Sequence, residues 1–360
     1  MSNKTKDIIV TILFASCIIT IFMLNVIAKD KDISFAERRK LSRFPEITIK
    51  KLTNGEVTKN LEKYSTDQFV GREFFRQIKA FVNTKIYKQK DNNKVFEKDK
   101  GIYSMDYPLK EANIQKSAEK ILNVYEKHLK GMDVYYAIIP DKNYYLEGDE
   151  YLKIDYTKLK NIMQKSLQEL QYIDIWNDLK TEDYYKTDLH WKQENLQGVV
   201  KKIQEKMKLE KTNFKYDVIN KGDFYGAYYG QIASKIKPDA INILTNETIE
   251  KCVTYNVETS KIGKIYEEPK TTDKYDIYLS GATPIITIEN PNSKTDKELL
   301  LFRDSFGSSI APLLVENYKK ITLIDLRYIS SNLLENYIEF KNQDVLFLYS
   351  TLILNQNVLK

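Results

Sequence analysis

The chain has 360 residues, 42% of them apolar, and a formal net charge of +6 at pH 7. This composition excludes a disordered chain and provides a core for one large domain or two smaller ones. The 56 basic and 50 acidic residues are interspersed along the chain, which gives no support for a nucleic-acid partner.

Residues 8–28 form an almost continuous apolar run, long enough to cross roughly 30 Å of hydrocarbon as a helix. Lys4 and Lys6 precede it, so the positive-inside rule predicts a cytoplasmic tip and an extracytoplasmic C-terminal domain. A cleaved signal peptide is the alternative, but the run ends without a small-x-small site. We predict an uncleaved anchor at residues 1–28 and a single-pass protein of the cell membrane. Cys17 lies in this run, so Cys252 has no intrachain disulfide partner outside it.

Residues 29–60 are predicted to form a polar stalk, with Pro45 and the Asn54-Gly55 turn signal. The extracytoplasmic domain is expected to cover residues 61–360. Apolar residues recur at helical spacing over 61–88, interrupted by Gly71, and over 110–130, where Gly131 is a plausible C-cap.

From residue 133 onward, short apolar runs alternate with amphipathic segments. Strands are predicted at 133–139, 172–176, 299–302, 321–324 and 345–349, and helices at 156–170, near His190, at 308–318 and at 331–340. The alternation is typical of an α/β fold with a parallel sheet. Residues 212–297 interrupt it with many Tyr, Thr, Ile and Gly residues, and we interpret them as a partly β insertion between the two halves of a site.

Two motifs indicate a Ser-His-Asp centre: TDLHW at 187–191 and RDSFG at 303–307. A serine hydroxyl becomes nucleophilic when an imidazole takes its proton, and a carboxylate fixes that imidazole's tautomer. The chain has only two histidines, His128 and His190. We therefore predict Ser305 as nucleophile, His190 as base and Asp188 as the residue that orients it. Backbone N–H groups around Ser305 are candidates for an oxyanion hole.

Each of these residues also has a purely structural interpretation. Asp188 suits the N-cap of a helix that begins at His190, Ser305 suits a turn, and Trp191 suits the core. Arg303 and Asp304 are expected to support the site, through a nearby carboxylate and a helix cap respectively. His128 is expected to be solvated near a helix C-terminus.

Other segments carry weaker signals. Lys142 follows a predicted strand in Pro140-Asp141-Lys142, where it would hold an anionic substrate or lie in solvent. Tyr229, Gly230 and Gln231 belong to a Tyr- and Gly-rich run that offers close backbone approach and aromatic surfaces for sugars, or a tight turn with core tyrosines. Nothing singles out a glycosidase carboxylate pair. No Cys/His cluster indicates a metal, and no nucleotide motif indicates a cofactor.

These motifs, together with residues 323–328 (LIDLRY), resemble the bacterial DHHW proteins, which are distantly related to alginate O-acetyltransferase domains of the SGNH-hydrolase type. The resemblance covers most of residues 35–355. Leu189 stands where the family name implies a first histidine, and Asp188 and His190 keep the Asp-x-His register of the wider group.

The resemblance implies a three-layer α/β/α, SGNH-like fold with a central, mostly parallel sheet. It implies an anchored O-acetyltransferase that acts on cell-surface polysaccharide through an acyl-Ser305 intermediate and receives acetyl from a membrane-bound O-acyltransferase. An esterase with the same triad, and a non-catalytic polysaccharide-binding or assembly protein, are the alternatives.

Overall fold

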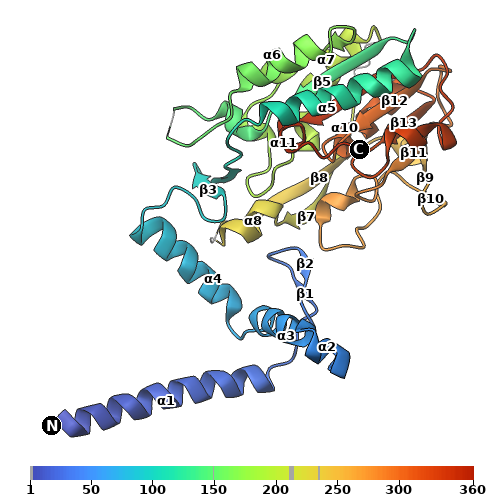
Figure 1. Cartoon of the computed structure of the whole chain (residues 1–360). Coiled ribbons are helices and arrows are strands. Elements are labelled where there is room, and N and C mark those ends of the chain that lie inside the picture. Colours follow the sequence, from blue (N-terminus) through green and yellow to red (C-terminus); the bar gives the residue numbers. More distant parts are fainter. Residues whose placement is uncertain (1–2, 149, 211–214, 234–235) are drawn as a thin grey trace. The chain divides into compact units, whose positions relative to one another are not determined.

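The computed structural model describes residues 3–148, 150–210, 215–233 and 236–360. The chain divides into two compact units (Figure 1). The first holds residues 3–92 and 233, and the second holds residues 93–232 and 236–360. Each unit is described by itself.

The first unit is mostly helical and contains these elements: α1 (Asn3–Ile27), β1 (Ile33–Ser34), β2 (Arg39–Lys40), α2 (Ile49–Thr53), α3 (Glu56–Asp67), α4 (Arg72–Phe81) and a π-helical turn at Val82–Ile86. Within the described residues, only α1 has the length and apolar composition needed to cross a membrane. Residues 29–60, predicted as a polar stalk, contain the β1–β2 pair, α2 and the start of α3. The helix interruption predicted at Gly71 is confirmed, since Gly71 is the left-handed N-cap of α4.

The second unit is built on an eight-stranded mixed sheet with the order β10-β9-β11-β13-β12-β14-β5-β6. Its strands are β5 (Val134–Ile139), β6 (Gln171–Tyr172), β9 (Val253–Asn256), β10 (Lys261–Gly263), β11 (Ile285–Glu289), β12 (Glu298–Arg303), β13 (Lys320–Ile324) and β14 (Asp344–Ser350). The strands from β13 to β6 are parallel, whereas β11, β9 and β10 extend the sheet antiparallel. The central strands are buried along nearly their whole length, as expected for a sheet covered on both faces.

Helices and two antiparallel strand pairs complete the second unit (Figure 1). They are α5 (Glu111–Val124), α6 (Tyr156–Ser166), α7 (Gln197–Lys206), α8 (Ala227–Ile232), α9 (Glu247–Lys251), α10 (Gly307–Ile310), α11 (Thr351–Gln356), β3–β4 (Val95–Lys98 with Gly101–Ser104) and β7–β8 (Asp217–Phe224 with Asp239–Thr245). Helix α5 packs against both α6 and α11. The predicted α/β class is confirmed.

The insertion predicted at 212–297 contains β7 to β11 and two short helices, apart from residues 212–214 and 234–235, which lie outside the described residues. Part of it is integral to the sheet, because β11 pairs with β13 and with β9. This pairing was not predicted, since an antiparallel edge does not alter the apolar pattern of the strands beside it.

Several predicted boundaries are wrong. No helix begins near His190, because the chain there forms tight turns and α7 starts only at Gln197. The predicted helices at 308–318 and 331–340 are mostly 3₁₀ turns, at Ala311–Asn317 and Ser331–Asn336. Short apolar segments that pack against a sheet need no full α-helical turns, so apolar spacing alone overestimates their length.

The prediction that His128 is solvated is also wrong. Its side chain is only 1% exposed and stacks on Phe340, with ring centroids 4.6 Å apart. Its Nδ1 lies 3.2 Å from Glu335 and its Nε2 lies 3.3 Å from the Ser331 carbonyl. These contacts give His128 a packing role and leave His190 as the histidine available to a catalytic site.

Candidate active site

The site lies at the carboxyl ends of the parallel strands β12, β14 and β5, where open α/β sheets collect functional groups. Asp304 follows β12 and is fully buried. One of its carboxylate oxygens accepts the Phe306 N–H at 3.0 Å, and the other accepts the Ser350 N–H at the end of β14 at 2.8 Å. Asp304 therefore ties the turn that carries Ser305 to the end of β14. The prediction gave it only the role of a helix cap.

Ser305, His190 and Asp188 form a continuous hydrogen-bonded line. His190 Nε2 lies 2.8 Å from Ser305 Oγ, and His190 Nδ1 lies 2.6 Å from Asp188 Oδ1. A carboxylate accepts hydrogen bonds, so the His190 Nδ1 that faces Asp188 carries the ring proton. The Nε2 lone pair then faces the serine hydroxyl. This is the arrangement in which an imidazole acts as a general base toward serine.

The Asp188 carboxylate is held by two further N–H groups. Oδ1 accepts the backbone N–H of His190 at 3.0 Å, and Oδ2 accepts that of Ala227 at 2.7 Å. Ala227 can approach because residue 226 is glycine: a Cβ there would overlap the Asp188 Cβ and the Thr187 carbonyl. The close backbone approach predicted for this Gly-rich run is therefore directed at Asp188.

The imidazole ring is clamped between aromatic side chains. Tyr275 stacks on His190 with centroids 3.8 Å apart and planes within 10°, and Phe306 packs at 4.8 Å. The Tyr275 hydroxyl donates to Ser309 Oγ, which also accepts the Trp191 indole N–H. Trp191 is fully buried, so it supports the ring and offers no platform for a ligand.

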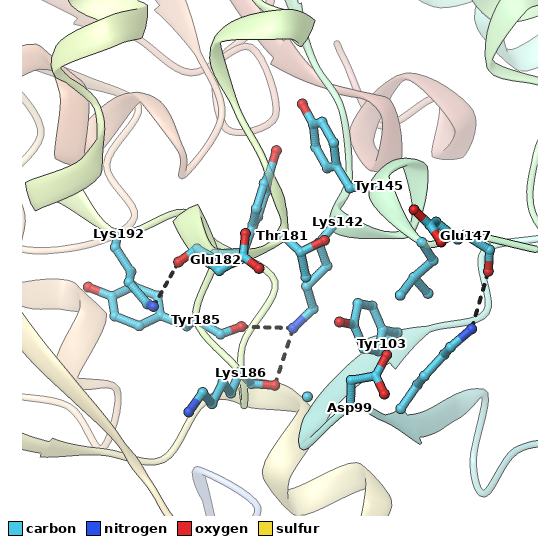
Figure 2. Close-up of a pocket in the computed structure, with 14 residues that line it drawn as sticks. Asp99, Tyr103, Lys142, Tyr145, Glu147, Thr181, Glu182, Tyr185, Lys186 and Lys192 are labelled. Atoms are coloured by element: carbon cyan, nitrogen blue, oxygen red, sulfur yellow. Dashed lines mark hydrogen bonds between the residues drawn. The ribbon is translucent and has the colours of Figure 1, made fainter.

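Lys142 donates hydrogen bonds to the loop that leads to Asp188, and Figure 2 shows two of them, to Tyr185 and Lys186. Its side chain is buried, and Nζ donates to the carbonyls of Tyr185 at 2.8 Å, Lys186 at 3.2 Å and Asp188 at 2.7 Å. Three carbonyls match the three donors of an ammonium group. Lys142 is therefore neither in solvent nor free to hold an anionic substrate, the two roles predicted for it.

Burial lowers the pKa of Lys142 to about 7, against the opposing effect of Asp188 and Asp239. The turn that presents Lys142 is itself anchored by Asp141, whose buried carboxylate accepts from the Tyr156 and Thr351 hydroxyls at 2.9 Å each. The end of β5 thus holds the Lys142 amine against the backbone of the Asp-x-His loop.

Several residues of the site were not predicted from the sequence. The Asp239 carboxylate accepts the Lys186 and Thr187 N–H groups and the Thr187 hydroxyl, within 2.7–2.9 Å. Tyr275, Asp239 and Gly226 all come from the insertion, so this segment builds the second side of the Asp188 loop. A buried carboxylate or a ring stacked on histidine leaves no local pattern, and no sequence signal identified the first two.

The remaining predicted residues lie beside the triad or apart from it. Arg303 is buried at the end of β12 with its Nη1 3.5 Å from Asp325, which also binds Arg327. Tyr229 lies in α8, where its N–H donates to the Thr187 carbonyl and its ring packs edge-on against Tyr225. In the same helix, Gly230 is buried, and Gln231 is exposed and accepts from Asn93 through its carbonyl.

A pocket of about 430 Å³ lies next to Lys142 (Figure 2). Lys142, Tyr185 and Lys186 line it together with Tyr103 and charged side chains, whereas Ser305 and His190 do not. Within the described residues, no group of three or more His, Cys, Asp or Glu side chains is arranged to hold a metal ion.

The second unit is an α/β fold with a mixed eight-stranded sheet, and Ser305 follows one of its central strands. It is similar to a DHHW family protein from Eubacterium siraeum, with a TM-score of 0.61, 20% identity and coverage of 74% of this chain and 95% of that one. Bacillus cereus PatB1, solved with a sulfonyl adduct, aligns with a TM-score of 0.56, 20% identity and coverage of 74% and 96%.

The O-acetyltransferase domain of Pseudomonas putida AlgJ aligns with a TM-score of 0.46 and 11% identity, covering 72% of this chain and 92% of that one. No protein-family model matches the sequence, and no curated protein matches it. The resemblance inferred from the motifs is thus confirmed as a likeness of fold.

Replacing Gly226 with alanine is expected to displace the Ala227 N–H from Asp188, because the added Cβ overlaps the Thr187 carbonyl and Asp188. Misplacement by about 1 Å costs on the order of 100-fold in rate. The measurement is the rate at which a sulfonyl fluoride labels Ser305. Gly198→Ala is the matched control, since its Cβ meets only ordinary contacts, the nearest at 3.6 Å. Equal labelling rates in both variants would contradict the prediction.

Lys142→Met is expected to change how stability depends on pH. The pKa of Lys142 falls from 10.5 to about 7 in the folded chain, so the unfolded chain binds more protons between those values. Wild type should therefore gain stability relative to Lys142→Met as pH rises from 7 toward 10, by at most about 1.4 kcal/mol per pH unit. Urea unfolding followed by tryptophan fluorescence reports on the second unit, which holds both tryptophans.

Exposed Lys100→Met is the control for that comparison, and its difference from wild type should not vary with pH. A constant stability difference between wild type and Lys142→Met at pH 6, 7.5 and 9 would show that Lys142 does not titrate in this range.

Proposed function

We propose that this protein is a membrane-anchored O-acetyltransferase that transfers acetyl to a hydroxyl of a cell-surface polysaccharide through an acyl-serine. The observation that carries the proposal is the line from Ser305 Oγ through His190 to Asp188, with heavy-atom distances of 2.8 and 2.6 Å. This geometry serves acyl transfer in general. The choice of acetyl and polysaccharide rests on the resemblance to DHHW proteins and alginate O-acetyltransferase domains.

In the first step, Ser305 Oγ attacks the carbonyl carbon of the acetyl donor while its proton passes to His190 Nε2. The tetrahedral intermediate collapses, the bond to the donor's leaving group breaks, and His190 returns the proton to that group. Asp188 stabilises the transient imidazolium. Acetyl-Ser305 remains.

In the second step, a sugar hydroxyl gives its proton to His190 Nε2 and attacks the acetyl carbon. The bond to Ser305 Oγ breaks, the serine recovers the proton from His190, and the acetylated sugar leaves. Water in place of the sugar would produce acetate by the same route, so access to the acyl-serine decides between transfer and hydrolysis.

Backbone N–H groups around Ser305 are the first candidates for the oxyanion hole. Three of them already have partners: Phe306 donates to the Asp304 carboxylate, Gly307 to the Asp304 carbonyl and Ser308 to the Ser305 carbonyl. The proposal therefore assigns the Ser305 N–H as the first oxyanion donor.

The anchor and the partners form part of the same proposal. Helix α1 would cross the cell membrane once and leave the second unit outside, where polysaccharide is accessible. A membrane-bound O-acyltransferase would supply acetyl groups to Ser305 at the outer surface. No cofactor is required, because the triad itself provides nucleophile and base.

Acetylation of Ser305 is the primary test. Full-length protein in detergent should acquire one acetyl group from an activated acetyl ester, and peptide mapping should locate it on Ser305. Ser305→Ala should abolish it, and His190→Ala and Asp188→Asn should slow it by a factor on the order of 100 to 10,000. His128→Ala is the matched control, since this histidine lies outside the site. Labelling that persists in Ser305→Ala would refute the acyl-serine.

The same protein distinguishes a transferase from an esterase. Acetyl-Ser305 prepared as above is mixed with a polysaccharide or with buffer alone, and acetylated sugar and free acetate are quantified. The proposal expects faster loss of the acyl-enzyme with sugar, and acetyl on the polymer. Equal loss in buffer, with all acetyl released as acetate, would make the protein an esterase. No acylation with several donors would favour a non-catalytic binding protein.

A further inference from the structure

Helix α4 has its polarity reversed relative to a helix of a water-soluble domain. Its apolar face consists of Phe74, Phe75, Ile78 and Phe81, which are 61, 48, 41 and 58% exposed. These residues fall on one side at 100° per residue. The residue that α4 buries is the small Ala80, 7% exposed. A soluble helix buries its apolar side, so this face needs another environment.

The polar side of α4 is held by the protein. Arg72 makes two hydrogen bonds to the Glu37 carboxylate, at 2.5 and 3.1 Å, and Arg76 Nη2 lies 3.7 Å from it. All three side chains are less than one-fifth exposed. Burial alone would raise the pKa of Glu37, but Arg72, Arg76 and Arg39 together lower it, so the carboxylate is charged. These ion pairs fix the rotation of α4 with its apolar face outward.

The start of α4 is tied to the end of α1 within the same unit. The Val70 N–H donates to Asn25 Oδ1 at 2.9 Å, two residues before α1 ends. Gln68 exchanges two hydrogen bonds with the Lys31 backbone, and the Tyr64 hydroxyl donates to Asp30 at 2.8 Å. The chain leaving α1 is therefore joined to the segment that leads into α4.

We propose that α4 is an interfacial helix whose apolar face inserts into the outer leaflet of the bilayer that α1 crosses. The proposal rests on the anchor in the proposed function. If α1 spans the membrane, Asn25 lies near the outer boundary of the hydrocarbon, and its bond to Val70 places the beginning of α4 at the same depth.

The composition of α4 suits this environment. Three of its four apolar-face residues are aromatic, and Phe75 contacts both Phe69 and Phe74 edge-on, with centroids 5.5 and 5.7 Å apart. Helices that lie in the membrane plane combine such a face with basic residues at its border. Lys79 and Lys85 provide exposed basic groups in and just after α4. The bilayer therefore accounts for both the apolar face and its flanks.

The test measures the depth of α4 in the full-length protein. Nitroxide labels are placed at Ile78→Cys, Lys63→Cys or Leu13→Cys in a Cys17→Ser, Cys252→Ala background, and each protein is reconstituted into bilayers that contain anionic lipid. Collision rates with oxygen, which concentrates in lipid, and with a water-soluble nickel complex are compared. The label at position 78 should be accessible to oxygen and at least several-fold less accessible to nickel than the label at 63, on the polar surface of α3.

Two outcomes would overturn the proposal. Nickel accessibility at 78 equal to that at 63 would show that α4 lies in water. Protection of 78 from both reagents would show that protein covers the face, either the second unit, a second copy or another membrane protein. Phe74→Ser combined with Phe81→Ser should raise nickel accessibility at 78, whereas Lys63→Ser should not.

The label at position 13 distinguishes a failure of this inference from a failure of the proposed membrane anchor. If position 13 has the oxygen and nickel profile of lipid while 78 does not, the anchor stands and the interfacial helix fails. If position 13 is accessible to nickel, the anchor itself fails. Acetyl labelling of Ser305 in the same samples reports the proposed chemistry independently of both.

Discussion

The second unit depends on how the Asp188 carboxylate is kept buried and aimed at His190. It has no exposed surface and accepts N–H groups from the His190 ring, the His190 backbone and Ala227. A buried carboxylate is stable when such donors replace the water it has lost. The donors also fix the orientation of the carboxylate, because the two His190 N–H groups bond Oδ1 and the Ala227 N–H bonds Oδ2. The stability of the loop and the orientation of the base therefore have the same cause.

The elements around this loop follow from that requirement. Lys142 donates hydrogen bonds to backbone carbonyls of residues 185–188, and the Asp239 carboxylate accepts backbone N–H groups of the same loop. One comes from the end of β5 and the other from the insertion, which also provides Gly226 and Tyr275. The part of the insertion that contacts the Asp188 loop therefore has a structural role. An isolated sheet would leave the loop with half of its partners.

The sequence predicted the three residues that the structure joins in one hydrogen-bonded line, because their types are restrictive. Two histidines left one sensible base, and an Asp two residues away completed the unit. It did not predict Tyr275 or Asp239, whose contacts span 85 and 52 residues of chain and depend on folding. It misassigned a helix at His190, since Asp188 accepts the N–H two residues later, as in an N-cap, without a helix following. For Lys142 it predicted either a contact with an anionic substrate or exposure to solvent, whereas the side chain is buried against backbone carbonyls.

The two units use polar contacts in opposite ways. In the second unit, the Lys142 amine bonds backbone carbonyls and the Asp188 carboxylate accepts N–H groups, all buried around His190. In the first unit, Glu37 draws the polar side of α4 inward and leaves aromatic rings outside. Turning an apolar face outward in this way is unfavourable in water. It becomes favourable where the outward face meets hydrocarbon, because the bilayer then buries the aromatic side chains that the protein leaves exposed.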